Sequence, residues 1–165
     1  MGILSGNPHD EPMHYGEIFS TWSYLAVNKG MHAMYQTLDN HTGDADLKNL
    51  LQEAIKGIEE ENKEIEALLK NNGITPPPTP PERAVAQLDD IPVGARVADQ
   101  ETAAILSADV AKGLIACSTI MGQSIREDIG AMFGKFHTAK AMFGVKVLRL
   151  DKEKGWLIPP PLHSK

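Results

Sequence analysis

Carboxylates and histidines spaced three residues apart are the side chains of this chain that could do metal chemistry, because a helix places such pairs on one face. Di-iron carboxylate bundles use one Glu on each of two helices and a Glu-x-x-His pair on each of the other two. The only Glu-x-x-His here is Glu11-Pro12-Met13-His14, whose proline suits the start of a helix and not its interior. Glu61-x-x-Glu64 lacks a histidine, and the residue three before His137 is Gly134. The standard di-iron site is therefore predicted to be incomplete.

Glu61 is the sharpest remaining candidate, because it interrupts an apolar stripe between Ile58 and Ile65. A carboxylate in such a stripe is costly unless it is paired or binds a metal. One interpretation is a non-standard site for iron or another divalent metal, in a protein that oxidises or stores iron. The second is a buried polar contact with Tyr, His or Lys, or a seam wide enough to reach water. A gap around Glu61 that holds a small molecule is the third. The ligands predicted for the metal site are Glu17, Glu61, Asp109, Asp128 and His137.

The other candidates have simpler explanations. Glu17 and Asp128 lie in predicted first turns, where the helix dipole favours an acid, and Arg126 lies close to Asp128. Asp109 is expected at the solvated edge of its helix. Cys117 follows an apolar stripe and is predicted to be a small core residue and not a nucleophile. One largely polar stripe on the first helix could line a site, form a partner surface or face solvent, and we expect it to face solvent: His14, Thr21, Leu25, Asn28 and His32.

Apolar residues recur with helical spacing in four segments and predict an all-α fold. The second segment has a 4-3 spacing typical of helices that pack nearly parallel. Asp99 and Ser124 are predicted N-caps, and Gly73 and Gly155 are predicted to end helices. The predicted helices span about residues 14–38, 44–72, 99–121 and 124–153.

A long connection separates the second and third helices. Residues 73–98 contain six prolines and no sustained period, so we expect an extended, semi-rigid chain. A helix of this size is roughly 40 Å long, which about 12 extended residues can span. The second and third helices can therefore run parallel, which predicts a ferritin-like four-helix bundle of two antiparallel hairpins joined by a Pro-rich crossover. The expected organisation is a flexible N-terminal segment (1–13), the bundle (14–153) and an extended tail (154–165).

Composition narrows the possible partners. The 165-residue chain carries a net charge of −6 and no basic cluster, which argues against nucleic acid. Its single cysteine excludes an intrachain disulfide, and no apolar run is long enough to predict a membrane span. The chain start lacks the features of a signal peptide, so we expect a cytoplasmic protein. The first helix is apolar on most sides and the tail carries Trp156-Leu157-Ile158-Pro159, which together predict a homo-oligomer, with a dimer favoured.

Three short motifs carry a family resemblance: Gly16-Glu17-Ile18 followed by Trp22, Ser124-x-Arg126-x-Asp128-Ile129, and Lys154-Gly155-Trp156-Leu157-Ile158-Pro159-Pro160. They resemble a family of ferritin-like bundles from spore-forming Gram-positive bacteria, related to the spore coat F proteins. The resemblance covers about residues 14–161. Members often carry two such domains in tandem, whereas this chain holds one. The resemblance implies a ferritin-like fold and a spore-associated or stress-related structural role, with no activity to carry over.

Overall fold

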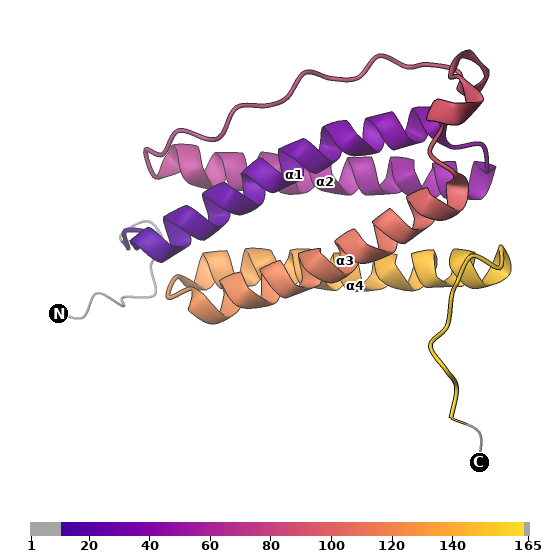
Figure 1. Ribbon diagram of the computed structural model, residues 1–165. Coiled ribbons are helices and arrows are strands. Elements are labelled where there is room, and N and C mark those ends of the chain that lie inside the picture. The colour runs from indigo at the N-terminus through magenta and orange to yellow at the C-terminus, as the bar shows by residue number, and fades with distance from the viewer. Residues whose placement is uncertain (1–10, 164–165) are drawn as a thin grey trace.

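The computed structural model describes residues 11–163, and within them the chain is helical with no strands. Four long helices form a bundle, which confirms the predicted all-α class (Figure 1). The helices are α1 (Tyr15–His41), α2 (Ala45–Asn71), α3 (Asp99–Gln123) and α4 (Glu127–Glu153), with two short 3₁₀ helices, η1 (Leu88–Asp90) and η2 (Val93–Ala95), before α3.

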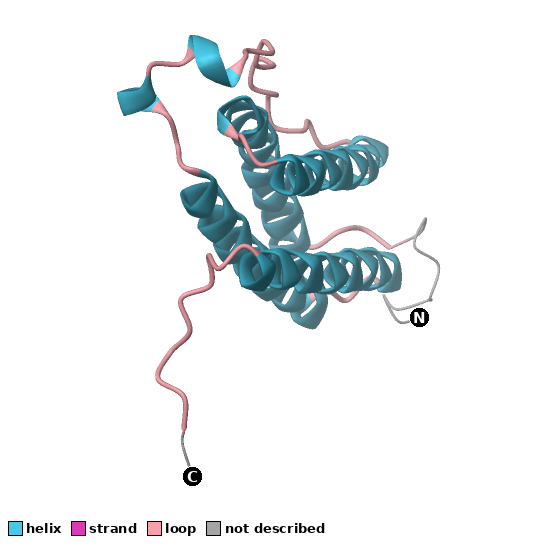
Figure 2. Cartoon of the chain, turned by 90° about the vertical axis from the view of Figure 1, so that its right-hand side faces the viewer, coloured by secondary structure: helices cyan, strands magenta, loops and turns pink. Residues whose placement is uncertain are grey.

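The helices form two hairpins, α1–α2 and α3–α4, which lie as two layers in the end-on view of Figure 2. The chain that leaves α2 runs back along the first hairpin before α3 begins (Figure 1), so α2 and α3 point the same way. Side chains of α1 hold this connection in place. Lys29 Nζ donates to the carbonyl of Pro77 at 2.7 Å, and Trp22 Nε1 donates to the carbonyl of Thr75 at 3.0 Å.

The helix ends differ from the predicted ones at two caps. Asp99 does not cap α3; its carboxylate instead accepts from the backbone N–H groups of Gly43 and Asp44, both at 3.0 Å, and joins the α1–α2 turn to the second hairpin. Ser124 does not begin α4, because its hydroxyl donates to the Ile120 carbonyl at 2.7 Å and ends α3. The predicted stops at Gly73 and Gly155 fit the structure, since both have the left-handed φ values (73° and 71°) that glycine adopts most readily.

The two terminal segments behave differently. The first ten residues of the predicted N-terminal segment lie outside the described residues, but Glu11 and Met13 are buried against the bundle. His14 then caps α1, because its Nδ1 accepts from the Gly16 N–H at 3.0 Å. At the other end, the tail leaves the bundle as an extended chain (Figure 1).

The core has two apolar clusters, one in each half of the bundle. The first surrounds Leu25, Ile65 and Phe133, and the second surrounds Leu51 and Leu106. Their order along each helix places the boundary between them near the middle of the bundle. One polar or charged residue from each helix lies at this boundary: Asn28, Glu61, Asp109 and Lys140.

Candidate functional site

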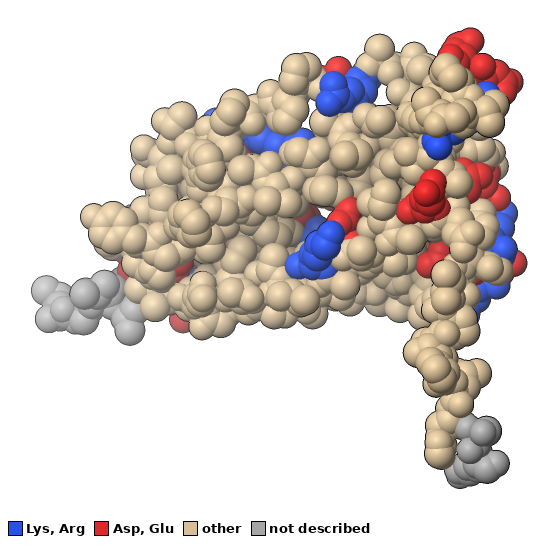
Figure 3. Space-filling view, in the orientation of Figure 1, with Lys and Arg blue, Asp and Glu red and all other residues tan. Residues whose placement is uncertain are grey.

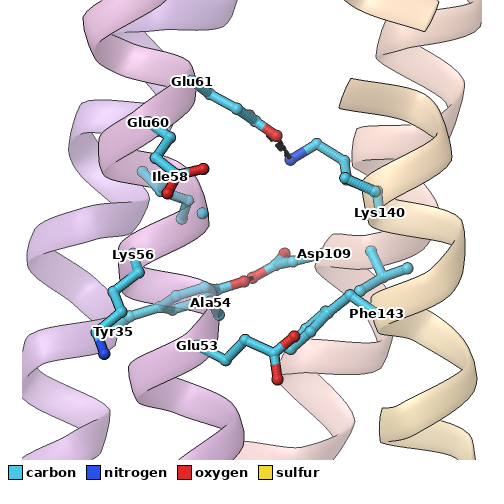
Figure 4. Close-up of a pocket in the computed structure, with 13 residues that line it drawn as sticks. Tyr35, Glu53, Ala54, Lys56, Ile58, Glu60, Glu61, Asp109, Lys140 and Phe143 are labelled. Carbon is cyan, nitrogen blue, oxygen red and sulfur yellow. Dashed lines mark hydrogen bonds and ion pairs between the residues drawn. The ribbon is translucent and has the colours of Figure 1, made fainter. Parts of the chain in front are cut away.

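We call the four residues Asn28, Glu61, Asp109 and Lys140 the central polar layer. Its centre is the carboxylate of Glu61, whose residue is 7% exposed. Lys140 Nζ lies 2.8 Å from Glu61 Oε1 and 3.0 Å from Oε2 (Figure 4). Asn28 Nδ2 donates to Oε2 at 2.8 Å, and the hydroxyl of Tyr24 donates to it at 3.0 Å. Glu61 therefore makes the buried polar contact that was one of the interpretations of its position.

Tyr24 enters this network as a neutral donor. Burial, followed by the negative charge of Glu61, raises the pKa of the Tyr24 hydroxyl well above its usual value. The ammonium of Lys140 also lies 5.8 Å from the centre of the Tyr24 ring, within the range of a cation–π contact. Cys117 Sγ is 3.5 Å from the Tyr24 oxygen and fully buried, and burial raises the pKa of its thiol. A thiol in these surroundings is a core group, as predicted, and not a nucleophile.

Asp109 forms a second, adjacent contact in the layer. The Tyr35 hydroxyl donates to Asp109 Oδ2 at 3.4 Å, and Lys112 Nζ donates to Oδ1 at 3.2 Å. Burial, followed by the charge of Asp109, raises the pKa of Tyr35, so this hydroxyl is also a neutral donor. Asp109 is half-buried, between the expected solvated edge and the core.

Gly113 makes room for the side chain of Lys140. A Cβ at position 113 would lie 2.9 Å from Lys140 Cδ, closer than such atoms approach. The lysine stem therefore passes α3 where that helix has no side chain, and its ammonium reaches α2. The close approach of Lys140 therefore explains why position 113, in the interior of a helix, is a glycine.

Two cavities flank the central polar layer. One of about 300 Å³ lies between Glu61, Asp109, Lys140 and Phe143 (Figure 4). The other, of about 500 Å³, lies mainly between α1 and α3. Both contain Tyr35, Ile58, Asp109 and Lys140 in their walls. The gap expected around Glu61 is therefore present, with Lys140 as a shared wall.

Glu17 and Asp128 lie at the end of the bundle where α1 and α4 begin. Glu17 is 1% exposed, and its Oε1 accepts from the backbone N–H groups of Ile125 and Arg126 at 2.9 and 3.0 Å. Its Oε2 accepts from the N–H of His14 at 3.1 Å. Glu17 therefore caps α1 and ties it to the start of α4, a larger role than the expected effect of the helix dipole.

Asp128 forms a bidentate pair with the buried guanidinium of Arg126, at 3.0 and 2.7 Å. Burial alone would raise the pKa of Asp128, but the hydrogen bonds and charge of Arg126 outweigh it and hold this pKa below its usual range. The guanidinium also donates to Asn72 Oδ1 at 2.8 Å, which joins the ends of α2 and α4.

The five predicted metal ligands thus do not lie together in one place. Glu17 and Asp128 lie at one end of the bundle, Glu61 and Asp109 line the same cavity, and His137 is half-buried on α4. Among residues 11–163, no group of three or more His, Cys, Asp or Glu side chains is placed to hold a metal ion. A metal site built from the predicted set stays a prediction.

The stripe expected to face solvent is largely buried, and that expectation was wrong. Thr21 and Leu25 are fully buried and Asn28 is 7% exposed. The hydroxyl of Thr21 donates to the Glu17 carbonyl at 2.6 Å, which satisfies it without water. Asn28 is buried because Glu61 accepts from it. His32 pairs with Glu59 at 3.0 Å rather than with Glu61.

The missed partner of Glu61 had a signal in the sequence. Phe133, Phe136, Lys140, Phe143 and Val147 have 3-4-3-4 spacing, so Lys140 occupies a seam position on α4 as Glu61 does on α2. Two opposite charges in the seams of two helices indicate a buried pair. The neighbouring Ala139 fits an apolar face nearly as well and conceals this pattern.

The model of the family described as "Protein of unknown function (DUF3231)" matches residues 1–165. The chain belongs to the DUF3231 family. It is 58% identical to the uncharacterized protein YvdQ of Bacillus subtilis (strain 168) over 163 residues, which cover 99% of this chain and 96% of the relative.

Solved structures also resemble this DUF3231 chain, and two of them are informative. A "putative spore coat protein" from Bacillus halodurans C-125 is 60% identical, with a TM-score of 0.95, and the match covers 96% of this chain and 100% of that one. A conserved hypothetical protein from Mycobacterium tuberculosis is 14% identical, with a TM-score of 0.66, and the match covers 81% and 96% of the two chains. The second likeness shows the fold alone.

Proposed function

We propose that this chain is a structural, self-associating protein of the bacterial spore, with a ferritin-like topology in which a lysine neutralises the mid-bundle carboxylate. The observation that carries the proposal is the position of Lys140, whose ammonium lies within 3.0 Å of both oxygens of Glu61. The spore role is supported by the description of the Bacillus halodurans relative.

The donor set around Glu61 suits an internal pair. Oε2 already accepts from Tyr24, Asn28 and Lys140, and Oε1 faces the same ammonium. A buried carboxylate with these partners is neutralised and its lone pairs are satisfied, so it needs no further cation. The layer joins α1, α2 and α4, and the contact of Asp109 with Tyr35 adds α3, so together they set the register of the four helices, which is a structural task.

The ferritin-like interpretation rests on topology. Two antiparallel hairpins joined by one long connection, with α2 and α3 pointing the same way, are the arrangement of ferritin-like bundles. Such a scaffold hosts many unrelated functions, so the site and not the fold has to support any activity.

Spore fractionation tests the proposed role. A tagged chain expressed in a spore-forming bacterium is expected in the coat extract of purified spores. A tag found only in vegetative cytosol or in the spore core would contradict the proposal. Light scattering of the purified chain tests self-association separately, since a monomeric mass at micromolar concentration would rule it out.

A divalent-metal carboxylate protein is the second candidate, favoured by the two carboxylates of Glu61 and Asp109 in the walls of one cavity. A metal there would require Lys140 to leave Glu61. Titration calorimetry with Mn²⁺ separates the candidates: binding by the wild-type chain that is lost in Asp109→Ala supports the metal site. Binding seen only in Lys140→Ala supports the lysine as the resident cation.

A further inference from the structure

The surface formed by α1 and α3 carries almost no net charge. Much of the face in Figure 3, where these helices lie in front, lacks charged side chains, and one basic and one acidic group flank its central hollow. Between residues 18 and 38 the only Asp, Glu, Lys or Arg is Lys29, which is buried. Between residues 102 and 123 the only ones are Asp109 and Lys112, which pair with each other at 3.2 Å. The charges of the bundle therefore lie mainly elsewhere.

This face is also apolar. The segment Val93–Gln123, which includes α3, contains an 18-residue window with a mean hydropathy of 1.5. Only 17% of this window is buried, and by length and composition alone the segment could cross a membrane. A helix that is apolar on most sides is normally covered on most sides. The large exposed apolar side chains of the face are Phe19, Val27 and Met34 on α1 and Ile105 and Ile115 on α3.

We infer that a second copy of this chain covers the α1–α3 face, an inference that rests on the proposed self-association and names its surface. The charge pattern favours an antiparallel twofold contact. Ala111 is the middle residue of α3, and Asp109 and Lys112 lie on either side of it. A twofold axis there places each Asp109 opposite the Lys112 of the other copy, so no charge is buried without a partner. The pattern is complementary to itself.

A lipid surface fits this face less well. Peripheral membrane attachment usually combines an apolar face with a cluster of Lys or Arg, whereas the chain has a net charge of −6 and the face has Lys112 as its one exposed basic residue among those described. The apolar residues exposed on α4, such as Met142 and Val145, alternate with Lys146 and Arg149. That surface resembles a solvated helix face more closely than an interface core.

Matched charge insertions test the location. Ile115 and Met142 are exposed to similar extents, 67% and 65%, on α3 and α4. Wild-type chain is expected to have twice the 18.0 kDa chain mass by light scattering. Ile115→Glu is expected to have the monomer mass, and Met142→Glu the dimer mass. Circular dichroism of both variants checks that each is folded.

Cross-linking tests the twofold arrangement with the fold undisturbed. Ala111 is exposed, and the native Cys117 is buried and does not compete. Ala111→Cys is expected to form an interchain disulfide under mild oxidation, whereas Ala131→Cys, exposed on α4, is expected to stay reduced. Vesicle flotation with anionic and neutral lipids is run on the same samples.

The outcomes separate this inference from the function it rests on. A monomeric wild-type chain overturns the proposed self-association itself. A dimer that survives Ile115→Glu, dissociates with Met142→Glu, or cross-links through Ala131→Cys in place of Ala111→Cys overturns only the assigned face. Flotation of the wild-type chain with vesicles overturns the choice of a second copy as the occupant.

Discussion

Replacing Lys140 with methionine removes the ammonium that joins α4 to α2 and keeps a flexible side chain of similar length. Glu61 would stay buried, with Tyr24 and Asn28 as its remaining donors and without the ammonium that neutralises it. Breaking one side of a buried ion pair typically costs about 3–5 kcal/mol. The Lys140 side chain is 17% exposed and the two neutral donors remain, so we expect a loss of about 2–3 kcal/mol in the free energy of unfolding. For a chain of this size that corresponds to a fall of roughly 5–10 °C in Tm.

Lys146 provides the matched control. It also lies on α4 and pairs with a glutamate of α2, Glu53, at 2.6 Å, but both side chains are about half exposed. Exposed pairs contribute about 0–1 kcal/mol, so Lys146→Met is expected to change stability by less than about 1 kcal/mol. Urea titrations followed by circular dichroism measure both variants under identical conditions.

A double-mutant cycle isolates the pair. Glu61→Gln removes the charge and keeps an acceptor for Tyr24 or Asn28, and combining it with Lys140→Met is expected to cost at least about 1 kcal/mol less than the sum of the single changes. If Lys140→Met costs no more than Lys146→Met, or if the two single changes are additive, Glu61 and Lys140 are not coupled and the reasoning about the central polar layer is refuted.

Two further perturbations probe neighbouring features. Alanine normally stabilises a helix interior by about 1 kcal/mol relative to glycine. Gly57→Ala is expected to gain this stability, because its Cβ meets no atom within 4 Å, whereas Gly113→Ala is expected not to, because its Cβ would meet Lys140. Thermal melts of both variants compare their Tm values. Asp128→Asn is expected to be less stable than wild type at pH 7. The folded-state pKa of Asp128 is depressed by Arg126, so its contribution is present above the unfolded value of about 3.9 and lost as pH falls through the folded value. Urea titrations between pH 7 and pH 2 should show the two proteins converge at acid pH; a constant difference would count against the pair.

Helical periodicity was sufficient to predict the four long helices, because local patterns determine where helices form. The predicted helix stops at Gly73 and Gly155 are correct, since a left-handed residue after a helix favours glycine. The predicted N-caps of α3 and α4 are wrong, because Asp99 and Ser124 make contacts that depend on neighbouring segments. A capping pattern describes one helix and contains no information about a second element that competes for the same side chain.

The candidate site could be predicted only in part from the sequence, because some of its contacts also depend on a second element. Glu61 was evident as a charge within an apolar seam, and Lys140 could have been found by the same test on α4. Asn28 belongs to a stripe that could line a site or face solvent, and only the facing helix shows that it contacts Glu61. Glu17 looked like an ordinary first-turn acid, and only the packing of α1 against the start of α4 shows that it receives two backbone N–H groups from that segment.

We propose that Lys140, and not a metal ion, neutralises Glu61. Elemental analysis tests it most directly, on wild-type chain and Glu61→Ala purified without chelator from cells grown with added iron, manganese and zinc. We expect substoichiometric metal that is the same in both proteins. Stoichiometric metal in the wild-type chain that is lost in Glu61→Ala would contradict it.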